Sequence, residues 1–250
     1  MEIFYSNDIK NDQIILSAQE SVHCVKVLRK RAGDEVKVSG GDGNLYHAII
    51  EDANIKATVL KIKSIEANFG LHDYFLHMAV ALPKKMDRFE WFLEKSTEIG
   101  IDEITPLVCA HSERKQMNAE RQSKIMLSAA KQSLKGYIPE LKPLTIFKNY
   151  IEETKNFYGL KMIAYCDHEL VNSEGLKIKR ISIVDALKKA KNEFDSRSMV
   201  LIGPEGDFSM EEIQMASDAG FIPISLGKSR LRIETAALMT VAAANLSKQG

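Results

Sequence analysis

A glycine-rich turn with an acid at its centre is the first segment whose residue types suggest chemistry. The apolar run Val200–Ile202 leads into Gly203–Gly206, a strand-to-turn pattern found where α/β proteins bind ligands. The turn has no lysine, and Pro204 removes a backbone amide that a phosphate cradle would use. Glu205 and Asp207 would repel a phosphate. The residue types therefore disfavour phosphate here and favour a neutral or cationic ligand.

A second glycine turn, Leu226–Arg232, precedes the last helical pattern of the chain. Glu234 lies in the first turn of that pattern, where a carboxylate suits the positive end of the helix dipole. No charged residue follows until Lys248, so the predicted helix is apolar on nearly every face. Such a helix is expected to be buried, against its own domain or against a partner subunit.

Together the two turns could enclose an adenosine, because both follow a strand and both have apolar rims. Nearby carboxylates favour a cation, and S-adenosylmethionine is an adenosine without phosphates that carries a positive sulfonium. The predicted cofactor contacts are Ile202, Gly203, Pro204, Glu205, Gly206, Leu226, Gly227, Leu231, Arg232, Glu234 and Thr235. The alternative is that both are ordinary tight turns between a strand and a helix.

Alternating strand and helix patterns must position these turns. Across residues 71–250, apolar runs such as "SMVLIG" alternate with helical patterns such as "ISIVDALKKAKNEF". This alternation predicts an α/β fold, a parallel sheet with helices on both faces. Residues 1–70 differ, because "DEVKVSG", "NLYHAII" and "IKATVLKIKSI" alternate as half-buried strands do, with a hairpin turn at Gly40–Gly43. We expect a small β-rich domain there, folded as a compact barrel.

The composition is that of a globular protein without a charge bias. Of 250 residues, 45% are apolar, and 34 lysines and arginines balance 34 aspartates and glutamates. The overall charge therefore neither predicts nor excludes a nucleic-acid partner.

Nothing in the sequence indicates export, a membrane span or a metal centre. Charged residues occur near the N-terminus, and no apolar run approaches the ~20 residues of a membrane span. The 3 cysteines lack a CxxC pair, which favours a reducing cytoplasm over a disulfide framework. No metal is expected, because His72, His77, His111 and His168 lack ligand spacing.

The two turns also carry a family resemblance. "IGPEGDFS" (Ile202–Ser209) with "LGKSRLRIETA" (Leu226–Ala236) resembles the signature of the SPOUT-class RNA methyltransferases. Further stretches are similar to the narrower 16S ribosomal RNA (uracil-N3)-methyltransferase family: "HCVKVLRKRAGDEV" (His23–Val36), "ALPKKMDRFEWFLEKSTEIGI" (Ala81–Ile101) and "AAKQSLKGYIPEL" (Ala129–Leu141). These blocks occur in order through both segments, and together they are far more specific than one glycine turn.

This resemblance implies a fold, a cofactor and a substrate. The fold would be a PUA-like, RNA-binding β-barrel at residues 1–70 and a SPOUT domain with a trefoil knot at residues 71–250. S-adenosylmethionine would bind in the knot of a homodimer. The target would be N3 of a uridine in 16S ribosomal RNA, within the small ribosomal subunit. Periodicity and spacing could not reveal a knot, since true knots are almost absent among folds.

Residues in the family blocks, together with one loop arginine, are the candidates for RNA contacts. The segment "HCVKVLRKR" has four positive charges and no acid, which suits RNA phosphates. The full set is His23, Lys26, Arg29, Lys30, Arg31, Lys84, Arg114, Gln132 and Lys135. Alternatively, His23 is structural, the basic segment is a solvated turn, and Lys84 and Arg114 only aid solubility.

Two departures from the family pattern concern RNA docking. Where the family block reads A-x-E-Q-S-x-R, this chain has Lys131 in place of the acid and Lys135 in place of the arginine; a family arginine near the N-terminus is also missing. Lysine keeps a charge for phosphate but cannot form the bidentate fork of arginine. These lysines suggest an alternative function, a non-catalytic RNA-binding assembly factor, although the intact turns argue against it.

Arg232 and Glu205 are the candidate catalytic residues. Uracil N3 becomes a nucleophile only when its proton leaves, so the site must align the methyl donor with N3 and offset the developing charge. Arg232 would stabilise the uracil anion through O2 or O4, and Glu205 would orient the cofactor or act as the base. The alternative for Arg232 is a salt bridge to Glu234 or to the partner's surface. A ribose 2′-O-methyltransferase of the same class is another possible activity.

Overall fold

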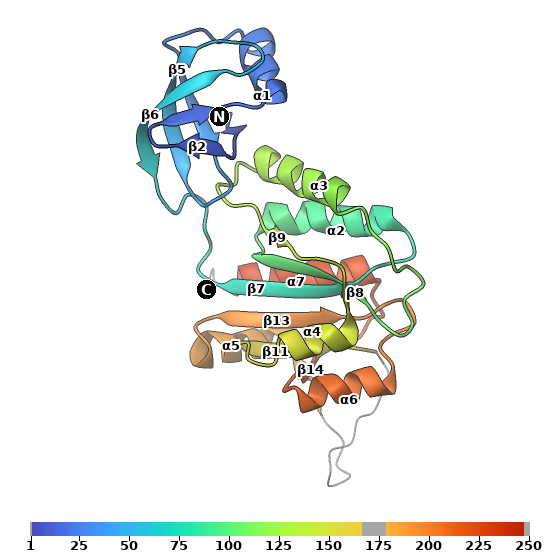
Figure 1. Ribbon diagram of the computed structural model, residues 1–250. Helices are drawn as coiled ribbons and strands as arrows, with labels where there is room; N and C mark the ends of the chain where they lie inside the picture. The colour runs from blue at the N-terminus through green and yellow to red at the C-terminus, as the bar shows by residue number, and fades with distance from the viewer. Residues whose placement is uncertain (1, 167–178, 248–250) are drawn as a thin grey trace. The chain divides into compact units, whose positions relative to one another are not determined.

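The computed structural model describes residues 2–166 and 179–247, and the chain divides into two compact units (Figure 1). The first unit comprises Met1–Leu71 and Met126–Ile138, and the second comprises His72–Ile125 and Pro139–Gly250. Each unit has its own cluster of buried apolar side chains.

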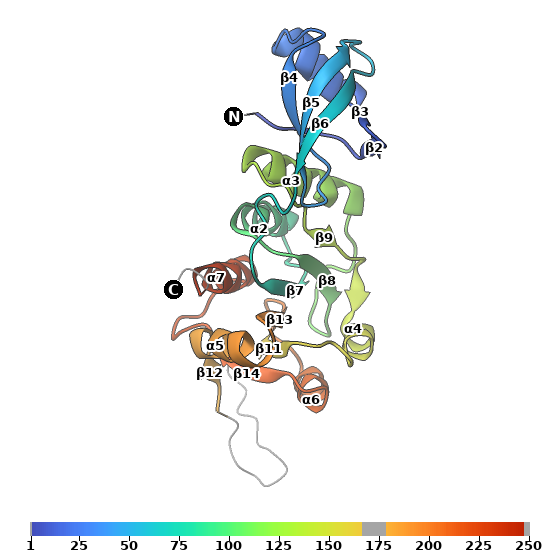
Figure 2. The ribbon, with the colours of Figure 1, turned by 90° about the vertical axis from the view of Figure 1, so that its left-hand side faces the viewer.

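The first unit is a six-stranded sheet that curls around its core (Figure 2). In the order β1-β4-β5-β6-β3-β2, only β1 and β4 pair in parallel. The alternating pattern of the sequence explains the fold: along β5, Tyr46, Ala48 and Ile50 are buried, whereas His47 and Ile49 are partly exposed. The strands are β1 (Phe4–Tyr5), β2 (Asp8–Lys10), β3 (Gln13–Ile15), β4 (Glu35–Ser39), β5 (Leu45–Asp52) and β6 (Val59–Glu66).

The three predicted strands of this unit and the hairpin turn at Gly40–Gly43 are confirmed. The unit also contains β1 to β3 and two short helices that the sequence pattern does not predict, α1 (Ala18–Val22) and the π-helix η1 (His23–Val27). Elements of two to five residues are too short to show a period. Among the described residues no pairing joins β1 to β2, so the sheet is curled but not closed by hydrogen bonds into the predicted barrel.

The second unit contains the predicted parallel sheet. Its strand order is β10-β8-β7-β13-β11-β14-β12, with β9 beside β8, and neighbouring strands are parallel throughout. The strands are β7 (Phe75–Ala81), β8 (Glu103–Val108), β9 (Glu140–Leu141), β10 (Thr145–Ile146), β11 (Leu160–Ala164), β12 (Ile181–Ser182), β13 (Arg197–Ile202) and β14 (Ile222–Ser225).

Helices cover both faces of this sheet, as predicted (Figure 2). One face carries α2, α5 and α7, and the other carries α4 and α6. Central strands are buried on both sides: in β13, Met199 and Leu201 join the core under α4 and α6, and Val200 and Ile202 are also buried. These helices are α2 (Met86–Ile99), α4 (Phe147–Glu153), α5 (Ile183–Glu193), α6 (Met210–Asp218) and α7 (Ile233–Leu246). The residues of α3 (Ala119–Gln132) are divided between the two units.

The strand order positions the two glycine turns. Parallel strands end at the same edge of a sheet, and only β11 lies between β13 and β14. Neighbouring strands are about 4.8 Å apart, so the turns after β13 and β14 start roughly 10 Å from each other. That spacing leaves room for a small ligand between them.

Candidate active site

A pocket of about 590 Å³ lies at the carboxyl edge of the second unit's sheet. Its walls are the loop after β11, the turn after β13, the turn after β14 and the start of α7. The volume is typical of a small-molecule site. The two glycine turns therefore contribute to one pocket.

Most predicted cofactor contacts line this pocket. They are Ile202, Gly203, Pro204, Glu205, Leu226, Gly227, Leu231 and Arg232. The remaining three, Gly206, Glu234 and Thr235, are neighbours of lining residues in the chain but do not line the pocket themselves. Gly206 is instead next to His111, whose Nδ1 lies 3.1 Å from the Gly206 carbonyl oxygen.

The loop after β11 contributes a wall of the pocket that the sequence patterns do not predict. Tyr165 and Cys166 line the pocket just after this strand, and the Arg180 guanidinium lies 4.6 Å from the Tyr165 ring centroid. Asp207 joins this wall to the turn after β13, because its Oδ2 accepts a 2.8 Å hydrogen bond from the Cys166 backbone N–H. No local motif marks Tyr165; it reaches the site only because β11 lies between β13 and β14.

Local hydrogen bonds hold the turn after β13. The Asp207 N–H donates to the Pro204 carbonyl at 2.9 Å, and Asp207 has φ +64°, a conformation that aspartate tolerates better than most residues. Ser209 and Glu212 form a capping box that starts α6. We call residues Gly203–Asp207 the acidic turn, because Glu205 and Asp207 are its charged residues.

The turn after β14 has the opposite charge. Lys228, Arg230 and Arg232 line the pocket, and all are exposed. We call Leu226–Arg232 the basic turn. Gly227 has φ +115° there, and a Cβ added to it would meet nothing within 4 Å. The pocket thus has carboxylates on one turn and cations on the other.

Glu205 and Glu234 share one cation. Glu205 Oε1 accepts a 3.1 Å hydrogen bond from the Lys84 backbone N–H and lies 3.9 Å from Arg88 Nη1. Glu234 Oε1 lies 3.8 Å from Arg88 Nε, and its buried Oε2 has no hydrogen-bond partner among the described residues. Arg232 forms no ion pair within the described part of the chain, so the salt bridge to Glu234 that was the alternative for Arg232 is absent there.

Lys84 and Arg114 lie at the same edge of the sheet, after β7 and β8. Arg114 Nη2 donates a 3.2 Å hydrogen bond to the Lys84 carbonyl oxygen, and Lys84 Nζ pairs with Glu113 at 2.9 Å. A second hollow of about 610 Å³ is lined by Met86, Asp87, Glu90, Arg114, Gln116, Met117, Asn118, Arg121 and Gln122. These two predicted RNA contacts are therefore close to Glu205.

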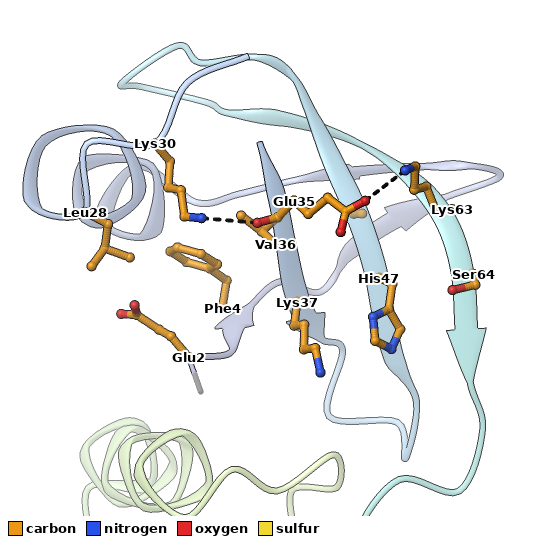
Figure 3. Close-up of a pocket in the computed structure, with 11 residues that line it drawn as sticks. Glu2, Phe4, Leu28, Lys30, Glu35, Val36, Lys37, His47, Lys63 and Ser64 are labelled. Carbon is orange, nitrogen blue, oxygen red and sulfur yellow. Dashed lines mark hydrogen bonds and ion pairs between the residues drawn. The ribbon is translucent and has the colours of Figure 1, made fainter. Parts of the chain in front are cut away.

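The first unit has a hollow of about 480 Å³ of different character (Figure 3). Lys30 Nζ donates to the Glu35 carbonyl oxygen at 3.3 Å, and Lys63 Nζ lies 2.9 Å from the Glu35 carboxylate. Its lining is Glu2, Phe4, Leu28, Lys30, Glu35, Val36, Lys37, His47, Ala48, Lys63 and Ser64. Of the predicted RNA contacts only Lys30 lines it; His23, Lys26, Arg29 and Arg31 lie outside.

The other predicted RNA contacts of this unit differ in exposure. Lys26, Arg29, Arg31 and Gln132 are exposed, whereas His23 and Lys135 are partly exposed. His23 Nε2 lies 2.6 Å from Glu2 Oε1. Burial lowers the pKa of Lys135 below its usual value.

Lys131, which replaces the family acid, forms an ion pair with Glu20. Glu20 Oε2 also accepts a 3.1 Å hydrogen bond from the Tyr5 backbone N–H. Lys131 therefore has a structural partner in the first unit.

Within residues 2–166 and 179–247, no helix is long and apolar enough to cross a membrane. The same residues hold no cluster of three or more His, Cys, Asp or Glu side chains that could bind a metal ion. His168 lies outside the described residues.

A curled β unit, together with a parallel α/β unit whose glycine turns form a pocket for a small ligand, defines a two-part protein of the α/β class. Residues 72–245 match the family model described as RNA methyltransferase domain, and residues 16–63 match the RNA methyltransferase PUA domain. The chain belongs to this RNA methyltransferase family, and the resemblance seen in the sequence is confirmed.

Relatives of the chain match it over nearly its whole length. The protein named ribosomal RNA small subunit methyltransferase E is 28% identical in Rickettsia conorii, over 95% of this chain and 91% of that protein. The protein of the same name in Bacillus subtilis is 27% identical, over 91% of this chain and 88% of that protein.

Two solved structures are similar along the full fold. A Porphyromonas gingivalis structure described as a "probable rRNA-methyltransferase" has a TM-score of 0.86 and 35% identity, over 100% of this chain and 99% of that chain. A Legionella pneumophila protein solved with bound cofactor SAM has a TM-score of 0.73 and 25% identity, over 98% and 96%.

Proposed function

We propose that this chain transfers a methyl group from S-adenosylmethionine to N3 of a uridine in 16S ribosomal RNA. The observation that carries the proposal is the pairing of an acidic and a basic turn around one pocket. The acidic turn suits a sulfonium cation, and the basic turn suits the anion that uracil becomes when N3 loses its proton. The names of the relatives support ribosomal RNA as the substrate.

The pocket residues fit S-adenosylmethionine. Ile202, Leu226 and Leu231 offer apolar contact for an adenosine, while backbone groups of both turns are available to its base edge. Glu205 and Asp207 provide negative charge without a phosphate-binding lysine on the same turn. When bound, this cofactor supplies a methyl group on a positively charged sulfur. Its presence in the Legionella pneumophila structure supports this assignment.

Arg232 and Glu205 have separate roles in this proposal. Arg232 is exposed in the pocket and has no ion pair among the described residues, so it can offset negative charge on uracil O2 or O4. Glu205 is held by the Lys84 amide and lies beside Arg88, and this environment supports an orienting role over that of a general base.

The RNA would be held by basic residues of both units. In the first unit these are Lys30 of the hollow and the exposed Lys26, Arg29 and Arg31. In the second unit Lys84 and Arg114 would bind the target nucleotide near Glu205. We assign residues 1–70 to a PUA-like domain and 71–250 to a SPOUT domain that acts on the small subunit in the cytoplasm.

We further propose a trefoil knot and a homodimer that buries α7. The knot rests on the family resemblance of the two turns. The dimer is supported by α7 and α2, which expose apolar side chains: Met239 is 44% exposed, Leu246 64% and Trp91 43%. Because α7 carries no charged residue after Glu234, a second copy could cover α7 without burying a charge of that helix beyond Glu234.

Calorimetry with S-adenosylmethionine tests the cofactor, and failure of the purified protein to bind it would exclude the proposal. Mass spectrometry of digested ribosomal RNA from a deletion strain tests the target. Loss of a uridine base methyl supports N3, whereas loss of a ribose methyl indicates a 2′-O-methyltransferase. Binding of RNA without transfer of labelled methyl would instead indicate an assembly factor.

A further inference from the structure

Arg88 lies in the first turn of α2, outside both glycine turns, and contacts residues of two separate elements. Its Nη1 is 3.9 Å from Glu205 Oε1 on the acidic turn, and its Nε is 3.8 Å from Glu234 Oε1 in the first turn of α7. Glu234 lies in the first turn of α7, the helix that directly follows the basic turn. One guanidinium thus connects the acidic turn to the end of the basic turn.

Burial makes this connection significant. The side chain of Glu234 is only 11% exposed, and those of Arg88 and Glu205 are 29% and 43% exposed. A buried carboxylate is costly without an opposing charge, and Glu234 Oε2 already lacks a hydrogen bond among the described residues. Without Arg88, two carboxylates would share this region with no cation within ion-pair distance in the described part of the chain.

The three charges also join the two elements. One guanidinium faces two carboxylates, so these three groups together carry one net negative charge, and Glu205 is the one of them that lines the pocket. Both distances exceed those of hydrogen bonds, so Arg88 attracts the two carboxylates by charge alone. The two distances are nearly equal, so Arg88 pairs with both elements and not with one of them.

We infer that Arg88 is a positioning residue of the cofactor pocket, which holds the acidic turn and the start of α7 at the spacing that S-adenosylmethionine requires. This inference rests on the proposed function, because it concerns the same pocket. Arg88 does not line the pocket, so it acts through Glu205 and Glu234.

The test compares Arg88→Met with the wild type by calorimetry, using S-adenosylmethionine and S-adenosylhomocysteine, which lacks the sulfonium charge. Loss of positioning weakens both ligands, and we expect about tenfold for each, as for a partly buried ion pair. Arg88→Lys should recover part of the loss, because an ammonium keeps the charge but lacks the fork. Unchanged affinities, or tighter binding of S-adenosylmethionine alone, would overturn the inference.

A double variant isolates the contact to Glu234. If Arg88 is needed to offset this carboxylate, Arg88→Met with Glu234→Gln should bind S-adenosylhomocysteine more tightly than Arg88→Met alone. Additive losses would contradict the inference, because they mean that the two side chains act independently.

Lys95→Met is the matched control on the same helix, since Lys95 pairs with Glu94 and Glu98 away from the pocket. It should leave both affinities unchanged, and a tenfold loss there would overturn a specific role for Arg88. Emission of Trp91, the single tryptophan, checks in each variant that α2 is intact. If the wild type does not bind S-adenosylmethionine, the proposed function fails; if it binds and Arg88→Met binds equally well, only this inference fails.

Discussion

The acidic and basic turns follow strands of one sheet and line one pocket, yet they differ in charge and in anchoring. The acidic turn is tied down, since Glu205 accepts from the Lys84 amide and Asp207 from the Cys166 amide. The basic turn presents exposed Lys228, Arg230 and Arg232. Under the proposed function, this difference divides two tasks within one pocket: a fixed anionic wall for the cofactor and an accessible cationic wall for the base to be methylated.

The largest expected effect is that of Arg232→Ala. If the basic turn serves the reacting base, kcat should fall roughly 10²- to 10³-fold, as when one charge-stabilising group is lost, while S-adenosylmethionine affinity stays unchanged. Single-turnover methyl transfer and calorimetry measure the two quantities. Equal kcat in variant and wild type would remove Arg232 from the mechanism.

Glu205→Gln should give the converse result. The amide keeps the shape of the side chain but loses the charge, so S-adenosylmethionine affinity should fall about tenfold, with a smaller change in kcat at saturating cofactor. A loss confined to kcat would instead assign Glu205 as the general base, and the division of tasks between the turns would be wrong.

Low pH should destabilise the sheet from which both turns extend, because His77 is buried in this sheet. Burial, together with the nearby Lys142, lowers the His77 pKa from 6.5 to about 4, although Glu103 lies 3.4 Å away. The folded state keeps this ring neutral while the unfolded chain protonates, so stability falls as the pH drops from about 6.5 to 4, by roughly 3 kcal/mol at most. Urea unfolding at pH 7 and pH 4.5 measures the loss. A His77→Gln variant with the same pH dependence would refute this origin.

Gly227 and Gly33 have similar backbone conformations, so comparing their variants separates an effect on cofactor binding from a general loss of stability. Gly227 in the basic turn has φ +115° and Gly33 in the first unit has φ +93°, and an added Cβ would meet nothing within 4 Å at either. Alanine at either position should therefore lower the free energy of unfolding by about 1–2 kcal/mol through backbone strain alone. Only Gly227→Ala should also weaken S-adenosylmethionine binding. Equal affinities in both variants would show that the basic turn does not shape the cofactor site.

The smallest expected effect is on RNA affinity. Arg230 is an exposed cation of the basic turn, and if this turn faces RNA phosphates, Arg230→Ala should weaken RNA binding uniformly and reduce the salt slope by about 1. Lys30→Ala should likewise weaken RNA binding and reduce the salt slope, because Lys30 lines the hollow of the first unit. Lys10→Ala is the control, because Lys10 is highly exposed and pairs with Asp8. A salt slope unchanged in Arg230→Ala would mean that the basic turn does not face RNA phosphates.

Local patterns predicted the elements well where they were long. The strand before each glycine turn and the helix after Arg232 occur as expected. The seven-residue α4 was missed, because it holds only about two turns of the helical period. Most residues with which the two glycine turns line the pocket were predicted, because they are consecutive in the chain, whereas Tyr165 and Arg180 were not predicted.

The sequence by itself determined the two turns, their opposite charges and the alternation that makes a parallel sheet, because these depend on neighbouring residues. Only the tertiary structure decided that β11 lies between β13 and β14, and so which wall completes the pocket. It also decided that Glu234 faces Arg88 rather than Arg232, two residues away. Strand order and side-chain partners depend on how distant segments pack, and no local period or spacing records that packing.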